Sequence, residues 1–497
     1  MSEDLFSQDI DLDKMPLSSR NIKSVLSINS DVIFREINVC GKKSFPISLV
    51  YVDGMVHSKT IADNIIKPLM DNDKLCDVRS EKEIIDRIEG GIVYAPAMDT
   101  RKSIRDALFD ILTGSCALIF DEENIAVTFE VKGFEQRAIT EPSEENIIKG
   151  PKEAFVENIR VNTAIIRRRL KTSDLVIEQT TVGRRTLTSL GIVYIKTIAN
   201  DSLVRELKSR LDKIDIDGAT GLSFIEEYII DNKYNMFPQV LATERPDKLS
   251  RHLLEGRVGL LIDGIPVAYI IPSVLSDFLR ASDDYSQNFI IASFTRILRY
   301  ISLVLALLLP AFYVAIVTFH QEMIPTELAL SIAESKKGVP FPTFAEVLFL
   351  LASFEVLLES GLRLPKSIGQ TVSIVGALVV GDAAVNAKFI SPAVVVVIAI
   401  TAIAGFTLPN QDLSYVVRIC RPILVVFSSI LGLIGLTYGI IYLLFYLALM
   451  ETYGIPYFAP FSSTDGKGLR DSIIVSPPSS VIFRPFMLRP KDKRRQR

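Results

Sequence analysis

The chain has 497 residues, which is enough for several domains. Its formal net charge of −3 at pH 7 argues against a general nucleic-acid-binding protein. The mean hydropathy of +0.31 hides a division, because charges recur every few residues up to about residue 290 and long apolar runs dominate from about 290 to 450.

The cysteines and histidines give no sign of a metal or catalytic site. The histidines are isolated, and no Ser-His-Asp, HExxH or P-loop pattern is present. The sequence therefore predicts no enzyme, no cofactor and no metal site. The cysteines fit no metal or disulfide spacing, and we expect buried thiols in a reducing compartment at Cys40, Cys76, Cys116 and Cys420.

Residues 1–30 open with the acidic and polar run MSEDLFSQDIDLDKMPLSSR. This run lacks the basic start and apolar core of a secretory signal. We expect a flexible acidic tail, followed by a large N-terminal region that stays in the cytoplasm.

The soluble half contains an internal repeat. A short apolar strand, a polar break and an amphipathic helix begin at Tyr51 and again at Tyr194, an offset of 194 − 51 = 143 residues. Two apolar strands joined by an acidic turn follow Gly114 and again Gly256, an offset of 256 − 114 = 142 residues. The two offsets predict similar α/β subdomains over 31–150 and 189–290. The alternative is coincidence, because both patterns are common.

Two charged stretches of the soluble half have open interpretations. A linking helical segment is predicted over 151–188, and its Arg167-Arg168-Arg169 run lies either on a solvated connecting helix or on a surface that docks a partner. The charged cluster TERPDK at 243–248 could suggest a catalytic site. Pro246 after Arg245, with Thr243 as a possible cap, favours a turn and the start of a helix.

A helical membrane domain is predicted over 291–450. Arg296 and Arg299 precede the first long apolar run, where they would anchor a cytoplasmic helix end. A bilayer span needs about 20 apolar residues, and the candidates are 300–319, 342–360, 370–388, 390–409 and 423–450.

The second candidate carries three acidic residues, each costly in hydrocarbon: Glu346, Glu355 and Glu359. We therefore expect this segment to be interfacial or packed against protein, which leaves about four spans. The Pro-rich tail over 451–497 ends in the basic run KDKRRQR. Positive charge favours the cytoplasm, so both chain ends would lie there, as an even number of spans requires.

The third candidate carries two stripes when it is drawn as a helix. One consists mostly of small residues that suit close helix packing: Gln370, Ser373, Ala377, Gly381 and Ala384. The other is polar at both ends and apolar in its middle, as expected of a pore with a hydrophobic gate: Thr371, Val375, Leu378, Asp382 and Asn386. The alternative is a helix buried within one subunit.

The last candidate contains a GxxxG motif at Gly435 and Gly439. Such a motif allows two helices to approach closely. The alternative is that these are incidental glycines of a membrane helix.

Several long strings resemble the A subunit of the spore nutrient-germinant receptors of endospore-forming bacteria. In the membrane half they are LPAFYVAIVTFHQEMIPTEL (309–328), VPFPTFAEVLFLLASFEVLLESGLRLPKSIGQTVSIVGALVVGDAAV (339–385) and YGIPYFAP (453–460). In the soluble half they include GPKEAFVENIRVNTAIIRRRL (150–170) and FPQVLATERPDKLSRHLLEGRVGLLIDGIP (237–266). Two positions depart from the family pattern, Ser360 where Ala is usual and Asp382 where Gln is common.

The resemblance implies a multi-pass protein of the inner spore membrane, in contact with lipid and without a nucleic-acid partner. It implies a transporter-like B subunit that binds the nutrient, a lipoprotein C subunit, and a homo-oligomer of the A subunit that takes part in ion release. We expect a gated pathway for monovalent cations. The alternative is a non-conducting scaffold that couples the nutrient-binding subunit to the downstream germination machinery.

Overall fold

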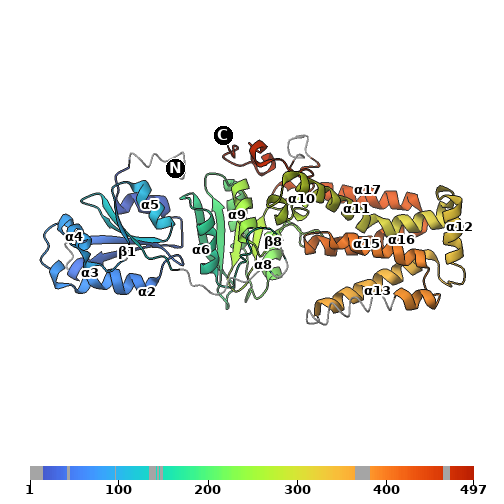
Figure 1. The fold of residues 1–497 in the computed structure, drawn as a ribbon, viewed down its shortest axis with the longest axis horizontal. Helices are drawn as coiled ribbons and strands as arrows, with labels where there is room; N and C mark the ends of the chain where they lie inside the picture. Colours follow the sequence, from blue (N-terminus) through green and yellow to red (C-terminus); the bar gives the residue numbers. More distant parts are fainter. Residues whose placement is uncertain are drawn as a thin grey trace. The chain divides into compact units, whose positions relative to one another are not determined.

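The computed structural model describes residues 15–41, 45–95, 97–133, 142, 145, 149–363, 381–462 and 471–496. The chain forms two compact units. Unit 1 combines Met1–Lys233, Val240–Ser273 and Ser479–Arg497. Unit 2 combines Tyr234–Gln239 and Val274–Pro478. The predicted fold class is confirmed: two α/β subdomains lie in unit 1, and the helical domain forms most of unit 2 (Figure 1).

The first subdomain is an antiparallel sheet covered on both faces by helices (Figure 1). One face packs on Ile61, Ile65 and Ile84, and the other packs on α1 and α5. Because both faces are covered, every residue of β4 is buried. The strand order is β1-β2-β4-β5-β3. The main elements are α1 (Ser19–Leu26), β1 (Val32–Asn38), β2 (Pro46–Val52), α3 (Lys67–Asp71), α4 (Glu81–Arg87), β3 (Met98–Arg101), α5 (Ile104–Leu112), β4 (Ser115–Phe120) and β5 (Ile125–Glu130).

The second subdomain repeats this topology strand for strand. Its sheet has the order β6-β7-β9-β10-β8, and all its printed pairings are antiparallel. β4 begins at Ser115 and β9 at Val258, an offset of 258 − 115 = 143 residues. The predicted duplication is therefore confirmed. The elements are α6 (Ile159–Arg169), β6 (Leu175–Val182), β7 (Thr188–Ile195), α7 (Asp201–Leu211), α8 (Leu222–Ile229), β8 (Leu241–Thr243), α9 (Pro246–Glu255), β9 (Val258–Ile262) and β10 (Ala268–Ile271).

The range 151–188, predicted as a linking helical segment, contributes to the second subdomain. Its first part forms α6, but Leu175–Val182 forms β6, which pairs along its whole length with β7. The first three residues of β6 are all apolar and the next four are all polar, so the sequence shows no alternation, and this masked the strand pattern. In the first repeat, α1 and β1 hold the places of α6 and β6.

Helix α6 is not a solvated connector, because its Arg167 side chain is buried. The Arg167 guanidinium forms a salt bridge with Asp31, with NH2 to Oδ1 at 2.6 Å, and also donates to Oδ1 of Asn29 at 2.8 Å. The same loop extends the second sheet, since Ser30 N donates to Ile177 O at 2.9 Å. Arg168 and Arg169 both pair with Glu153. Arg167 therefore joins the two subdomains, whereas Arg168 and Arg169 hold the stretch before α6.

The expectation that the cysteines form no disulfide is wrong for one pair. Cys40 and Cys76 are joined by a disulfide, with their Cα atoms 5.3 Å apart. Their sequence separation of 36 matches no recognisable disulfide spacing, because the contact arises from tertiary structure. Cys116 and Cys420 are buried thiols, as expected.

Unit 2 is built on long helices. Two of them, α11 and α16, are long and apolar enough to cross a membrane, and α15 and α17 are shorter apolar helices. Val314, Val347, Val394, Val425 and Leu436 meet in one core. The elements are α10 (Leu275–Phe278), η6 (Ser282–Tyr285), α11 (Phe289–Phe319), α12 (Thr326–Ser335), α13 (Thr343–Arg363), α15 (Pro392–Phe406), α16 (Gln411–Leu431), α17 (Leu433–Leu449), β11 (Glu451–Thr452) and β12 (Ile455–Pro456).

The predicted segment 423–450 is not one helix. α16 ends at Leu431, α17 begins at Leu433, and Gly432 between them has a φ of 62°. Residues with a side chain rarely adopt this conformation, so the glycine marks the break. The continuous apolar run concealed it.

The last part of the C-terminal tail, Ser479–Arg497, belongs to unit 1, whereas the part before it belongs to unit 2. Lys491 N donates to Ile198 O at 3.0 Å, and its Nζ donates to Oδ1 of Asp201 at 2.7 Å. Arg484 Nε donates to Leu254 O at 2.9 Å. The basic tail thus lies against the second subdomain.

Removing the Asp31 carboxylate should destabilise unit 1, because Arg167 would remain buried without its counter-charge. We expect Asp31→Ala to lower the free energy of unfolding by about 3–5 kcal/mol. The measurement is urea unfolding of the full chain in detergent, with hydrogen exchange of the α6 amides. As a control, Asp53→Ala removes a pair with Arg160, whose side chain is 56% exposed, and should cost about 0–1 kcal/mol. Equal losses in the two variants would contradict this role.

Unit 1 should lose stability in mild acid through His252. Burial lowers the pKa of His252 to about 4, although a hydrogen bond with Glu255 opposes the shift. The unfolded chain therefore takes up the proton first, and stability present above about pH 6.5 is lost as the pH falls towards 4. The loss at pH 5 is about 2 kcal/mol. His252→Gln should flatten the pH dependence of urea unfolding, whereas the exposed-site variant His57→Gln should retain the wild-type slope. Equal slopes in all three proteins would refute the assignment.

Candidate functional site

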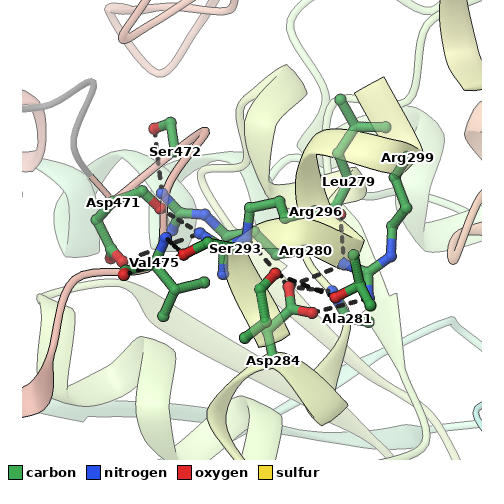
Figure 2. Close-up of polar contacts among 12 residues, drawn as sticks. Leu279, Arg280, Ala281, Asp284, Ser293, Arg296, Arg299, Asp471, Ser472 and Val475 are labelled. Carbon is green, nitrogen blue, oxygen red and sulfur yellow. Dashed lines mark hydrogen bonds and ion pairs between the residues drawn. The ribbon is translucent and has the colours of Figure 1, made fainter. Parts of the chain in front are cut away.

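A buried charge cluster surrounds the first turns of α11 (Figure 2). The carboxylate of Asp284 in η6 accepts hydrogen bonds from Arg296 Nε at 3.1 Å and from Arg299 NH2 at 2.7 Å. It also accepts from Ala281 N at 3.3 Å. The side chains of Asp284 and Arg296 are almost completely buried. This one carboxylate therefore joins the loop before α11 to two successive turns of the helix.

The segment after the helical bundle completes the cluster (Figure 2). Arg296 NH1 donates to Asp471 O at 2.5 Å, and Arg280 NH2 donates to Ser472 Oγ at 3.4 Å. Val475 N donates to Ser293 Oγ at 3.0 Å. The start of the first long helix is therefore held against the segment that follows the last one.

Arg296 and Arg299 were expected to precede the first long apolar run and to anchor a cytoplasmic helix end. The structure places them within the first long helix, not before it. α11 begins at Phe289, where the side chain of Asn288 caps Ile290 N at 2.9 Å, so both arginines lie inside the helix. Sequence reasoning missed the cluster because its acceptors lie at distant positions. The acidic run at 283–284 before the helix was the available signal.

The bundle carries further charged groups that sequence reasoning placed on α13. Glu346 accepts from Ser391 N at 2.7 Å, and Lys336 Nζ lies 3.6 Å from its other oxygen. Glu355 pairs with Arg418 of α16 at 2.6 Å. Glu359 lies one turn further along α13 on its exposed side. The carboxylates of Glu346 and Glu355 therefore contact protein groups.

A second arginine of α16 reaches into the core at a proline. Pro310 lies inside α11 and has no N–H to donate to Ala306 O, four residues earlier. Arg421 Nε donates to that carbonyl at 2.6 Å. Gly405 lies beside the guanidinium, since a Cβ there would be at an ordinary contact distance of 3.6 Å from Arg421 NH2. The pairing supplies the hydrogen bond that the proline removes, and the Pro310 interruption of the first apolar run was its only sequence signal.

The predicted pore helix is described only at its C-terminal end. Residues 381–386 are helical, and Asp382 and Asn386, one turn apart, are exposed. Ala384 between them packs against the bundle core, and a Cβ at Gly381 would lie 3.9 Å from Val395. The described end of this segment therefore turns Asp382 and Asn386 away from its own bundle. The other stripe residues lie outside the described residues: Gln370, Thr371, Ser373, Val375, Ala377 and Leu378.

The GxxxG glycines pack within this chain. A Cβ on Gly435 would lie 2.1 Å from Phe427 O, and one on Gly439 would lie 2.6 Å from Leu424 Cδ2. A side chain at Gly435 would push α17 away from α16 because it would meet backbone, whereas one at Gly439 would require the end of the Leu424 side chain to move. The motif thus sets the close approach of two consecutive helices.

The TERPDK cluster is a structural element. β8 ends at Thr243, and α9 begins at Pro246. Burial disfavours the charged form of Glu145, but Lys248 at 2.6 Å and neighbouring groups outweigh it, so the pKa of Glu145 is lowered.

Within the described ranges, no three His, Cys, Asp or Glu side chains gather to hold a metal.

The bond from Arg421 to Ala306 O should depend on Pro310. Arg421→Met leaves that carbonyl without its donor, at a cost of about 1–3 kcal/mol. Pro310→Ala restores an N–H to the helix, so the same Arg421 substitution should then cost at least ~1 kcal/mol less. The measurement is a double-mutant cycle on detergent-induced unfolding of the full chain. Additive costs would exclude the coupling.

Comparison with known proteins places the whole chain in one family. The family model described as Bacillus/Clostridium GerA spore germination protein matches residues 20–487. Spore germination protein KA of Bacillus subtilis is 36% identical over 97% of this chain and 88% of its own. Spore germination protein B1 of the same organism is 35% identical over 96% and 97%. Spore germination protein GerLA of Bacillus cereus is 34% identical over 95% of each chain.

One solved structure is also similar, the N-terminal domain of the A subunit of the Bacillus megaterium spore germinant receptor GerK3. The identity is 30% and the TM-score 0.41, over 52% of this chain and 93% of that one. The family match extends through both units, and it includes the helices that carry the Asp284 cluster and Arg421. The chain therefore belongs to the GerA family of spore germination proteins.

Proposed function

We propose that this chain is the A subunit of a nutrient-responsive germination receptor in the inner spore membrane, where copies of it form a gated pathway for monovalent cations. A transporter-like B subunit would bind the nutrient, and a lipoprotein C subunit would complete the receptor. The observation that carries the proposal is the outward polar face of Asp382 and Asn386, opposite the core-facing Ala384. In a ring of copies this face would line an aqueous path, and its carboxylates would favour cations.

Two further observations support a membrane pathway. α11 and α16 have the length and composition to cross a bilayer, and their neighbours α15 and α17 are apolar. The last part of the C-terminal tail lies in unit 1 together with the N-terminal region, which agrees with both chain ends on the cytoplasmic side. The sequence pattern assigns the constriction to Val375 and Leu378, one turn before the exposed carboxylate.

Shortening the constriction residues should open the gate. Val375→Ala removes two methyl groups from each copy, so the apolar collar widens and wets more readily. We expect a leak of monovalent cations without nutrient, and early germination of spores that carry the variant. Asp382→Asn should leave the gate closed and weaken cation preference, because it removes charge with little volume. The measurement is ion flux in cells that express the complex, at matched protein level.

A matched control separates the gate from general packing. Val394→Ala makes the same change at a fully buried core position and should lower stability, by about 0.5–2 kcal/mol on the scale of core substitutions, without a leak. If Val375→Ala and Leu378→Ala behave like Val394→Ala, with normal dormancy and unchanged flux, the conducting role fails. The chain would then act as a non-conducting scaffold.

A further inference from the structure

The segment Tyr234–Gln239 leaves unit 1 and joins unit 2, although the residues before and after it belong to unit 1. Its attachment point is the last turn of α17. Tyr446 Oη donates to Asn235 Oδ1 at 2.8 Å, and Asn235 Nδ2 lies 3.1 Å from Met450 Sδ. The ring of Phe237, which is 6% exposed, lies 6.1 Å from that of Tyr446. Asn235 and Phe237 therefore fix the segment to the end of an apolar helix.

The alternate residues of this segment point the other way. Tyr234 is 86% exposed and Met236 is 48% exposed, although both are large and largely apolar. Asn235 and Phe237 face the helix, whereas Tyr234 and Met236 of the same turn-and-bend segment are turned outward. The exposed pair is thus held in place by the buried one.

The helix beneath this segment presents an apolar face of its own. At about 100° per residue, its seven exposed large residues fall within about 160° of one another: Ile434, Tyr438, Ile441, Tyr442, Leu444, Phe445 and Leu449. Tyr446 and Met450, which hold Asn235, lie along one edge of that face. The 17 residues of α17 span about 25 Å, close to the ~30 Å hydrocarbon core of a bilayer. The segment therefore lies where an apolar, outward-facing helix ends.

From this arrangement we infer that Tyr234 and Met236 insert into the headgroup region of the phospholipid bilayer and anchor the segment Tyr234–Gln239 at the membrane surface. Aromatic side chains with one polar end concentrate at this depth, and the usual ones are Trp and Tyr. The chain contains no Trp, so Tyr is its only aromatic side chain of that kind. The membrane would then oppose any movement of this segment, which connects α8 to β8.

The absence of Trp makes the test direct, because each introduced Trp is the only one in the protein. Single variants Tyr234→Trp and Met236→Trp of the full chain are reconstituted in vesicles of phosphatidylcholine and phosphatidylglycerol, with or without bromine near the top of the acyl chains. Tyr442→Trp tests the α17 face, and Tyr94→Trp, at a site 71% exposed in unit 1, serves as the water-exposed reference.

We expect brominated lipid to quench at least half of the emission of both anchor variants, and aqueous iodide to quench mainly Tyr94→Trp. Quenching of the anchor variants by iodide but not by bromine would overturn the inference, since the segment would then lie in water. Protection from both quenchers would also overturn it, because another protein surface would cover the segment. Quenching of Tyr442→Trp alone would place the helix in lipid and the segment outside it.

Discussion

Buried arginine is the constraint on which the rest of this structure depends. The largest fully buried side chains include Arg167, Arg245, Arg257 and Arg296. A guanidinium cannot shed its charge, so each must find acceptors where it lies, and the chain must be folded to supply them. Each of these four finds its acceptors at a joint, where two parts of the chain meet. Arg167 lies between the two sheets, and Arg245 donates to Pro151 O before α6. Arg257 donates to Pro272 O at the edge of unit 1, and Arg296 lies at the start of α11. The joints are therefore polar and specific, whereas the sheets and the bundle between them are apolar.

In the helical unit the same rule applies to the backbone. A proline inside a buried helix leaves the carbonyl four residues earlier without its backbone donor, so a neighbouring group must supply one. Arg421 meets this need at Ala306 O, and it also places a permanent charge among apolar helices. The Glu355–Arg418 pair lies one turn earlier on α16. α16 is therefore both the most charged of the apolar helices and the one that α11, α13 and α17 all contact.

The sequence predicted the repeated subdomains and the strands and helices that leave a periodic pattern. Equal offsets revealed the duplicated subdomain, because strands and amphipathic helices leave local patterns. The position of β3 and β8 at the sheet edges was not predictable, since strand order depends on pairings between distant residues. Asp31 and Arg167 are 136 residues apart, and nothing local relates them. Among the candidate site residues, the sequence identified Glu346 and Glu355 but could not name Ser391 or Arg418 as their partners, and it overlooked Arg421 because a lone arginine beside an apolar run resembles a helix flank.

The docked tail has a consequence for the order of assembly. Ser479–Arg497 belongs to unit 1, yet the ribosome must first synthesise the whole stretch Val274–Pro478 of unit 2. At bacterial speeds of ~5–20 residues per second, the surface formed by Ile198, Asp201 and Leu254 waits on the order of 10–40 s for its last segment. During that interval the bundle can insert while this surface is still open to chaperones. The tail segment Ser479–Arg497 therefore docks on unit 1 only after the helices of unit 2 have been made.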